Sequence, residues 1–292
     1  TAVVELKARF DEEQNINWAE ELERAGVNVV YGFAGLKIHA KLCLVVRREP
    51  KGMRRYAHIG TGNYNASSAK IYTDLGLFTA RDDICSDVQD LFNVMTGFGV
   101  IDNYRRIFVS PNHLRANITR LIREEAEIHR AKGGGRIIMK CNQLVDQGIV
   151  RELYEASRAG VKIECVVRGI CSLRPGIKNV SETISVHSIV GELLEHARIY
   201  YFEHGGEPVM YVGSADMMTR NLNGRIEVLT PVLDKKLMDN ILKQIVNPQL
   251  ADNTHAWELL SDGSYKKIKR EAGVAAMDSQ SHIKRVLNLL KR

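Results

Sequence analysis

Alternating apolar and polar positions in the first hundred residues predict strands interrupted by two helices. Over residues 3–10 the apolar side chains fall on one face and the charged ones on the other, as in a strand with one buried side. Gly26 follows a helical stretch and is its stop signal. The elements predicted here are a strand over 3–10, a helix over 15–25, a strand over 27–31, a strand through 35–46, a hairpin turn at 50–52, a return strand over 55–59 and a helix over 84–98.

The rest of the chain predicts a longer alternation of helices and strands. Its first helix begins at Ser110-Pro111 and carries an apolar stripe opposite an arginine-rich face. The elements predicted here are that helix, ending at glycines 133–135, then a strand over 136–141, a helix over 147–159, a strand over 161–168, a short helix near 188–194, a strand around His196, a helix near 234–246, a turn at 262–264 and an amphipathic end over 283–290. Such alternation indicates an α/β fold.

Two short stretches carry a histidine two residues before a cation and lead into apolar strands. They are His39-Ala40-Lys41 and His196-Ala197-Arg198. Upstream of each stands a glutamate four residues before an arginine. Downstream of each comes a glycine-rich turn, and a carboxylate follows that turn. The matching positions are Glu5 with Glu164, Arg9 with Arg168, Gly60 to Asn63 with Gly213 to Asp216, and Asp74 with Glu227. Because these features recur in one order, the sequence predicts two copies of one structural unit.

The two copies differ at their beginnings. Residues 136–160 open the second copy with a strand and a helix, and nothing before Thr1 corresponds to them. We therefore expect a C-terminal fragment of a longer protein, with a first α/β domain over 1–108 that lacks its opening elements and a second over 109–292.

Composition narrows the class of protein. The chain has 292 residues, 45% of them hydrophobic and 26% charged, which is typical of a globular protein with a sizeable core. It contains no apolar run long enough for a membrane span, and its first residues do not resemble a signal peptide, so we expect a cytoplasmic protein. The five cysteines form no C-x-x-C pair, which argues against a zinc or disulfide framework. Cys43 and Cys165 lie in apolar strands and are expected to be reduced core thiols.

Charge and the histidine motifs point to phosphate chemistry. The net charge of +6 suits a polyanion, although the basic run 266–270 is expected to be solvated surface. A single histidine on a strand is more often structural, but a neutral imidazole can attack phosphorus and a second histidine can protonate the leaving oxygen. Predicted phosphate contacts are Lys41, Arg198, Arg9 and Arg168, together with Asn63 and Asp216 at the two glycine turns, where backbone N–H groups also bind anions.

Two families share these motifs. His-x-Lys followed by a glycine turn resembles the phospholipase D superfamily, but the acidic position of that motif is occupied here by Val46. A more specific resemblance, covering nearly the whole chain, is to polyphosphate kinases of the bacterial type 1 family. The stretches that carry it are GLKIHAKLCLVVRRE, RRYAHIGTGNYN, IYTDLGLFTA, VVRGICSLRPG, LLEHARIYYF and YVGSADMMTRNL.

The resemblance implies two related, phospholipase D-like α/β domains of mixed sheet and an ATP:polyphosphate phosphotransferase that works reversibly through a phosphohistidine. It implies that His39 is phosphorylated and that His196 is the second essential histidine. Nucleotide contacts are implied for Tyr72, Arg168 and His196. It implies Mg²⁺ as cofactor, with Arg9 holding a phosphate or ligand water of the metal, because an arginine cannot ligate a cation. The implied partners are ATP or ADP and polyphosphate, without nucleic acid, and the full-length protein is expected to be a homo-oligomer.

Two other functions are compatible with the residues. A phosphodiesterase of the phospholipase D type would use the same histidines, although Val46 and the Tyr72 to Asp74 segment favour the kinase. A non-catalytic polyanion-binding fragment would result if the shortened first domain does not assemble its site. Tyr72 also has a structural alternative, as a core aromatic beside Leu75 and Leu77.

Overall fold

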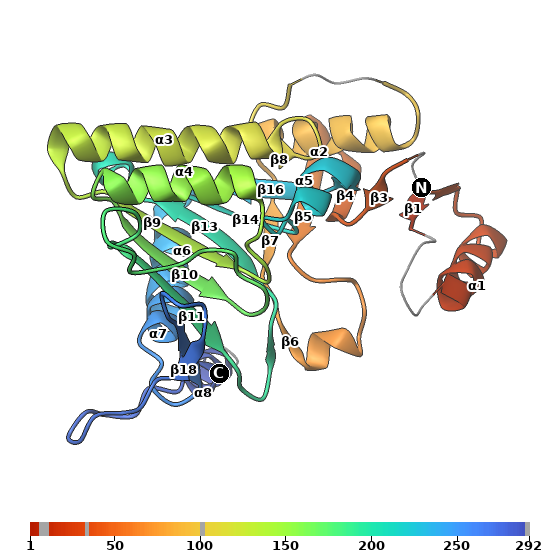
Figure 1. Cartoon of the computed structure of the whole chain (residues 1–292). Helices are drawn as coiled ribbons and strands as arrows, with labels where there is room; N and C mark the ends of the chain where they lie inside the picture. Colours follow the sequence, from red (N-terminus) through yellow and green to blue (C-terminus); the bar gives the residue numbers. More distant parts are fainter. Residues whose placement is uncertain (6–11, 33–34, 100–102, 290–292) are drawn as a thin grey trace.

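The computed structural model describes residues 1–5, 12–32, 35–99 and 103–289, and within them two α/β units lie side by side (Figure 1). The larger unit is built on one mixed nine-stranded sheet, in the order β18-β17-β11-β10-β9-β13-β14-β16-β8. Strands β9, β10 and β11 are parallel, and the other pairs are antiparallel. The strands are β8 (Phe108–Val109), β9 (Arg136–Cys141), β10 (Lys162–Val167), β11 (Ile184–Ile189), β13 (Arg198–Phe202), β14 (Val209–Gly213), β16 (Val228–Pro231), β17 (Ala256–Leu259) and β18 (Tyr265–Lys267).

Helices cover both faces of the large sheet. The long helices α3 (Leu114–Lys132) and α4 (Gln147–Arg158) run together over one face in Figure 1. The other face packs against α6 (Lys235–Ile241), a π-helical turn η3 (Leu242–Val246) and α7 (Asn247–Leu250). Because successive side chains of a strand point to opposite faces, β9 serves both cores: Met139 packs under α3 and α4, whereas Ile138 packs toward α6 and η3. Helices α5 (Thr219–Gly224) and α8 (Ser279–Leu289) complete the unit.

The smaller unit has a three-stranded antiparallel sheet, β4-β5-β7, made of β4 (Lys41–Glu49), β5 (Gly52–Gly60) and β7 (Gly76–Thr79). Helix α2 (Asp82–Met95) packs on one face of this sheet, against Leu42, Leu44 and Ile59. A separate parallel pair, β1 (Ala2–Val4) and β2 (Val29–Tyr31), lies beside helix α1 (Glu12–Arg24). The short 3₁₀ turn η1 (Ser68–Lys70) precedes the segment that reaches the second unit, and a second 3₁₀ turn, η2 (His204–Gly206), joins β13 to β14 within the second unit.

Two short parallel bridges join the units. Strand β3 (Lys37–Ile38) of the first unit pairs with β15 (Arg225–Ile226) of the second, and β6 (Tyr72–Thr73) of the first pairs with β12 (Leu194–Glu195) of the second. Each bridge therefore consists of one short strand from each unit, and each bridge lies next to one of the two histidine motifs.

Most predicted elements are present, and the mixed α/β fold is confirmed. The predicted helix near 188–194 is wrong, because this segment finishes β11 and then runs through a loop into β12. The strand predicted over 3–10 ends at Val4 among the described residues, and α3 begins at Leu114, later than its predicted start. The boundary predicted after residue 108 falls inside β8, which belongs to the large sheet.

The prediction that Cys43 is a core thiol is also wrong, whereas Cys165 is buried as expected. Cys43 is exposed because it points to the face of β4 opposite α2. Among the described residues, that face also exposes Val45 and Phe78.

Candidate functional site

Both histidines lie at a break between two strands, next to a bridge from the other unit. His39 separates β3 from β4, and its N–H together with that of Ala40 donates to Ile226 O at 3.0 and 2.9 Å. His196 separates β12 from β13, and its N–H together with that of Ala197 donates to Thr73 O at 3.2 and 2.8 Å. The sequence predicts each histidine inside a continuous strand. The structure shows that this is wrong, because a strand ends before each histidine and the next begins after it. Each main chain is instead fixed by one carbonyl of the other unit.

A carboxylate follows each of these carbonyls and contacts the same histidine. Glu227 Oε2 lies 2.9 Å from His39 Nδ1, and Asp74 Oδ1 lies 2.8 Å from His196 Nδ1. Glu227 is fully buried, and its second oxygen accepts from Asn221 Nδ2 at 2.6 Å. A carboxylate on Nδ1 favours the tautomer with the proton on that nitrogen. The reactive nitrogen of each histidine is then Nε2.

The turns predicted to bind phosphate also support the carboxylates. Thr61 Oγ1 donates to Asp74 Oδ1 at 2.5 Å and accepts from Leu75 N–H at 2.9 Å. In the second unit Ser214 Oγ donates to Glu227 Oε2 at 2.5 Å and accepts from Val228 N–H at 3.2 Å. Gly62 packs so closely that a Cβ atom there would lie 2.0 Å from Asp74 Oδ2. The internal duplication therefore extends to the hydrogen bonds of the site.

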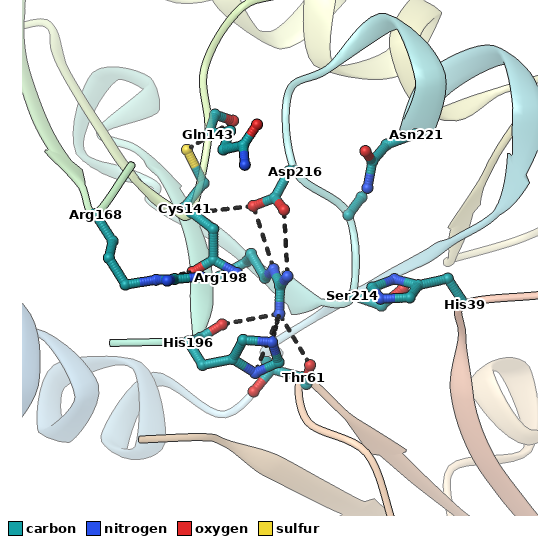
Figure 2. Close-up of polar contacts among 12 residues, drawn as sticks. His39, Thr61, Cys141, Gln143, Arg168, His196, Arg198, Ser214, Asp216 and Asn221 are labelled. Carbon is teal, nitrogen blue, oxygen red and sulfur yellow. Dashed lines mark hydrogen bonds and ion pairs between the residues drawn. The ribbon is translucent and has the colours of Figure 1, made fainter. Parts of the chain in front are cut away.

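Two buried cations, Lys41 and Arg198, lie close to both histidines. Lys41 Nζ donates to His39 O. The Arg198 guanidinium donates to Asp216 at 3.3 and 3.2 Å, to Thr61 O at 3.1 Å and to His196 O at 2.9 Å, and its Nη1 lies 3.2 Å from His196 Nε2. Figure 2 shows this guanidinium between Asp216 and the His196 ring, with His39 beside Ser214. The two histidines thus share one cationic centre.

Burial and charge set the protonation states. Burial lowers the pKa of His39 and of His196, and the charges of Lys41 and Arg198 lower both further, although Glu227 and Asp74 oppose the shifts. Burial also lowers the pKa of Lys41 to about 7. Both imidazoles are therefore neutral at neutral pH, which is the state in which His39 can act as a nucleophile.

Asp216 is an acceptor at this site. Burial alone would raise the pKa of Asp216, but the charge and hydrogen bonds of Arg198 outweigh it and the pKa is lowered. The carboxylate also accepts from Asn142 N–H at 2.7 Å. The ionised Asp216 carboxylate orients the Arg198 guanidinium. Because such a carboxylate repels phosphate, the phosphate contact at Asp216 stays a prediction.

One predicted nucleotide residue, Tyr72, borders a pocket beside His196. The Tyr72 ring centroid lies 4.9 Å from that of His196, and Tyr72 lines a cavity of about 480 Å³ together with Asn63 and Asp74. Asn63 is exposed at the end of its glycine turn. Arg168 is half-buried just after β10, with its Nε 3.3 Å from the Asn142 side chain (Figure 2). Arg9, the predicted magnesium-associated residue, lies outside the described residues.

Asp74 and Glu227 are the functional residues that the sequence analysis left without a role. Their equal spacing after the glycine turns marked them as part of the repeat, and a carboxylate repeated with a histidine is itself a signal for a histidine partner. The sequence does not predict which histidine each carboxylate contacts, because each contact joins residues of different units.

Comparison with known proteins gives the family. Residues 1–101 match the family model described as polyphosphate kinase C-terminal domain 1, and residues 107–280 match polyphosphate kinase C-terminal domain 2. The chain belongs to the polyphosphate kinase family. Polyphosphate kinase 1 of Chlorobaculum tepidum is 52% identical over 270 residues, which are 92% of this chain, and polyphosphate kinase of Synechocystis is 52% identical over 280 residues, which are 96% of it.

A polyphosphate kinase of known structure has the same fold. The crystal structure of the enzyme from Porphyromonas gingivalis superposes with a TM-score of 0.91 at 37% identity, covering 100% of this chain and 44% of the other. The chain spans 38% of the length of the two curated polyphosphate kinases named above, at their C-terminal domains. Among the described helices, none has the length and apolar character that a membrane crossing needs.

Proposed function

We propose that this chain carries the phosphotransfer site of an ATP:polyphosphate phosphotransferase, which moves the terminal phosphate of ATP reversibly to polyphosphate through a phosphohistidine at His39. The observation that carries the proposal is the reciprocal arrangement of the histidines. Each has Nδ1 on a carboxylate of the opposite unit, and both stand at the cationic centre made by Lys41 and Arg198. Family membership supports the substrates, ATP and polyphosphate.

The geometry fits a two-step transfer. In the first step the lone pair of His39 Nε2 attacks the terminal phosphorus of ATP, an N–P bond forms, and the bond from phosphorus to the bridging oxygen breaks to release ADP. In the second step a terminal oxygen of polyphosphate attacks the same phosphorus, and the N–P electron pair returns to Nε2. Glu227 stabilises the positive charge that develops on the imidazole, and Lys41 and Arg198 neutralise the phosphoryl oxygens.

His196 is proposed to donate to the leaving oxygen. Its pKa is lowered by burial and by Arg198 in this structure, but a bound polyphosphate or ATP brings negative charge that raises it again. Tyr72, whose ring lies beside the His196 ring and borders the pocket, is proposed to contact the nucleotide, and Arg168 is proposed to contact its phosphates.

Mg²⁺ is proposed to bind together with ATP, through the phosphates of the nucleotide. Among the described residues, no group of three His, Cys, Asp or Glu side chains could hold a metal ion, and Asp74 and Glu227 are engaged with histidines. Mg²⁺ commonly keeps its waters and binds substrate phosphates, so the residues present fit a metal carried by ATP. In that role it would neutralise phosphate charge, with Arg9 proposed to contact its phosphates or waters.

The test uses a chimera in which this chain replaces the matching C-terminal region of the Chlorobaculum tepidum polyphosphate kinase 1, with the parent enzyme as positive control. Incubation with ATP labelled at the terminal phosphate should give an acid-labile, base-stable label at His39 and chain growth of polyphosphate. His39→Gln should abolish both. A label that maps to another residue, or polyphosphate synthesis that survives His39→Gln, would refute the mechanism.

The same preparations separate the competing functions. Hydrolysis of bis(p-nitrophenyl) phosphate without ATP labelling would instead indicate a phosphodiesterase. Retention of polyphosphate on the protein with neither reaction would indicate a polyanion-binding fragment.

A further inference from the structure

A buried carboxylate stands directly before the second histidine of the site. Glu195 is 2% exposed, and its side chain accepts four hydrogen bonds: from Lys140 Nζ at 2.8 Å, Gln249 Nε2 at 2.7 Å, Thr73 Oγ1 at 3.0 Å and Gln280 Nε2 at 2.8 Å. These donors come from β9, α7, β6 and α8 respectively. We call these five side chains the Glu195 cluster. It joins these four elements to β12 at one point beside His196.

The fold by itself does not need this cluster. The position equivalent to Glu195 in the first unit is Ile38, directly before His39. Lys140 is also only 2% exposed, so the second unit buries a full ion pair where the first has an apolar side chain. Replacing a buried ion pair by apolar residues is often neutral or stabilising, and stability alone is therefore a weak reason for it.

The cluster fixes both groups that hold His196. Thr73 donates its hydroxyl to Glu195, and its carbonyl accepts from the N–H groups of His196 and Ala197. The next residue along the chain is Asp74, whose carboxylate contacts His196 Nδ1. Movement of Thr73 would thus disturb the main chain of His196 and the partner of its imidazole together.

Helix α8 closes the cluster from the C-terminal side. The Gln280 amide donates to Glu195 Oε1 and to Leu193 O at 2.8 Å, and its oxygen accepts from Leu193 N–H at 2.9 Å. Gln280 is buried, and a Cβ atom on Gly191 would lie 2.5 Å from its oxygen. One glutamine therefore ties α8 to the short segment that enters His196.

We infer that Glu195 and Gln280 are positioning residues for His196, so that the C-terminal helix α8 is part of the phosphotransfer machinery. The inference rests on the proposed function only in giving His196 its task, because the positioning of the imidazole can be measured without turnover. Loss of either contact is expected to loosen Thr73 and to weaken the contact between Asp74 and His196.

The test compares two glutamine-to-leucine variants, one in α8 itself and one in η3 at a residue that contacts α8. Gln280→Leu removes the amide from the Glu195 cluster without changing charge. Gln244→Leu is the matched control, because Gln244 accepts from or donates to His282 of α8 at 3.0 Å and lies outside the cluster. Imidazole pKa values are measured by NMR titration on the 292-residue chain, with His39→Gln and His196→Gln used to assign the signals.

The expected result is specific to one histidine. Asp74 raises the pKa of His196, so Gln280→Leu should lower that pKa and leave the pKa of His39 unchanged, while Gln244→Leu changes neither. In the chimera, Gln280→Leu should slow ATP labelling of His39, the step in which His196 donates to the leaving oxygen, by about tenfold or more, since misplacement of a reacting group by about 1 Å can lower a rate about 100-fold. The label should stay at His39, and transfer to polyphosphate should fall with the labelling rate.

Several outcomes would overturn the inference. One is an unchanged His196 pKa in Gln280→Leu, and another is an equal loss of transfer in both variants. If Gln280→Leu does not fold, Thr73→Val removes one donor to Glu195 with little change of shape, and a wild-type His196 pKa in that variant would equally refute the inference. Absence of ATP labelling in the unsubstituted chimera would refute the proposed function, whereas the NMR comparison would still decide the role of the Glu195 cluster.

Discussion

Replacing Glu227 by glutamine tests the proposed nucleophile directly. The carboxylate is fully buried and accepts from His39 Nδ1, from Ser214 Oγ at 2.5 Å and from Asn221 Nδ2 at 2.6 Å. All three partners present a donor to it, so the amide NH₂ of a glutamine must face one of them. A buried donor left without an acceptor destabilises a protein by about 1–3 kcal/mol. Glu227→Gln should therefore lower the unfolding free energy by about that amount while the protein still folds.

The effect on chemistry should be much larger than the effect on stability. Glu227 raises the pKa of both His39 and Lys41, so its loss leaves the imidazolium that forms during attack without a counter-charge and moves Lys41, with a pKa of about 7, toward its neutral form. General base or charge-stabilising partners of this kind contribute about 100-fold to 10,000-fold in rate. We expect the rate of ATP labelling of His39 to fall by at least about 100-fold.

Single-turnover labelling with ATP, followed by quenching in base, measures this rate in the chimera. Glu258→Gln on the exposed surface of β17 is the matched control and should label normally. Labelling of Glu227→Gln at the rate of the unsubstituted protein would refute the idea that this carboxylate activates His39. A loss of labelling together with loss of the folded signal in circular dichroism would also contradict the expectation, since it would make Glu227 a folding residue.

Three further predictions concern the groups around the histidines. The pKa of Lys41 is lowered from 10.5 to about 7 in the folded chain, so between these values the unfolded chain binds more protons and the unfolding free energy rises with pH. Lys41→Met should flatten this rise. Equal slopes of the unfolding free energy against pH in the two proteins, measured by urea unfolding from pH 7 to 10, would contradict the prediction. Arg168→Ala should weaken ATP binding by about tenfold, as expected for loss of one charge-assisted contact, with an unchanged melting temperature, and a large fall in that temperature would return Arg168 to a structural role. Tyr72→Ala should raise the KM for ATP while the domain stays folded and Tyr72→Phe has a smaller effect; unfolding of the alanine variant with a harmless phenylalanine would show a core role.

The motifs and most elements of the second unit were readable from the sequence because they depend on neighbouring residues. The strand of Arg136–Cys141 and the helix of Gln147–Arg158 follow from short-range periodicity and from glycine stop signals. The repeated His-x-cation motif and the equal spacing of Asp74 and Glu227 also lie in the linear order of residues. At 188–194 the periodicity is ambiguous, since a short apolar run does not distinguish strand from helix, and the structure has the end of β11, a loop and the start of β12 where a helix is predicted.

Only the tertiary structure decided which groups meet. His39 and Glu227 are 188 residues apart, and His196 and Asp74 are 122 apart, so their pairing depends on how the two units dock and not on any local pattern. The same holds for the exposure of Cys43, which follows from the side of β4 that α2 covers, and for the Glu195 cluster, which gathers residues from five elements. Local periodicity sets which face of a strand is apolar, whereas the protonation of each histidine is set by its burial and by charged groups from both units.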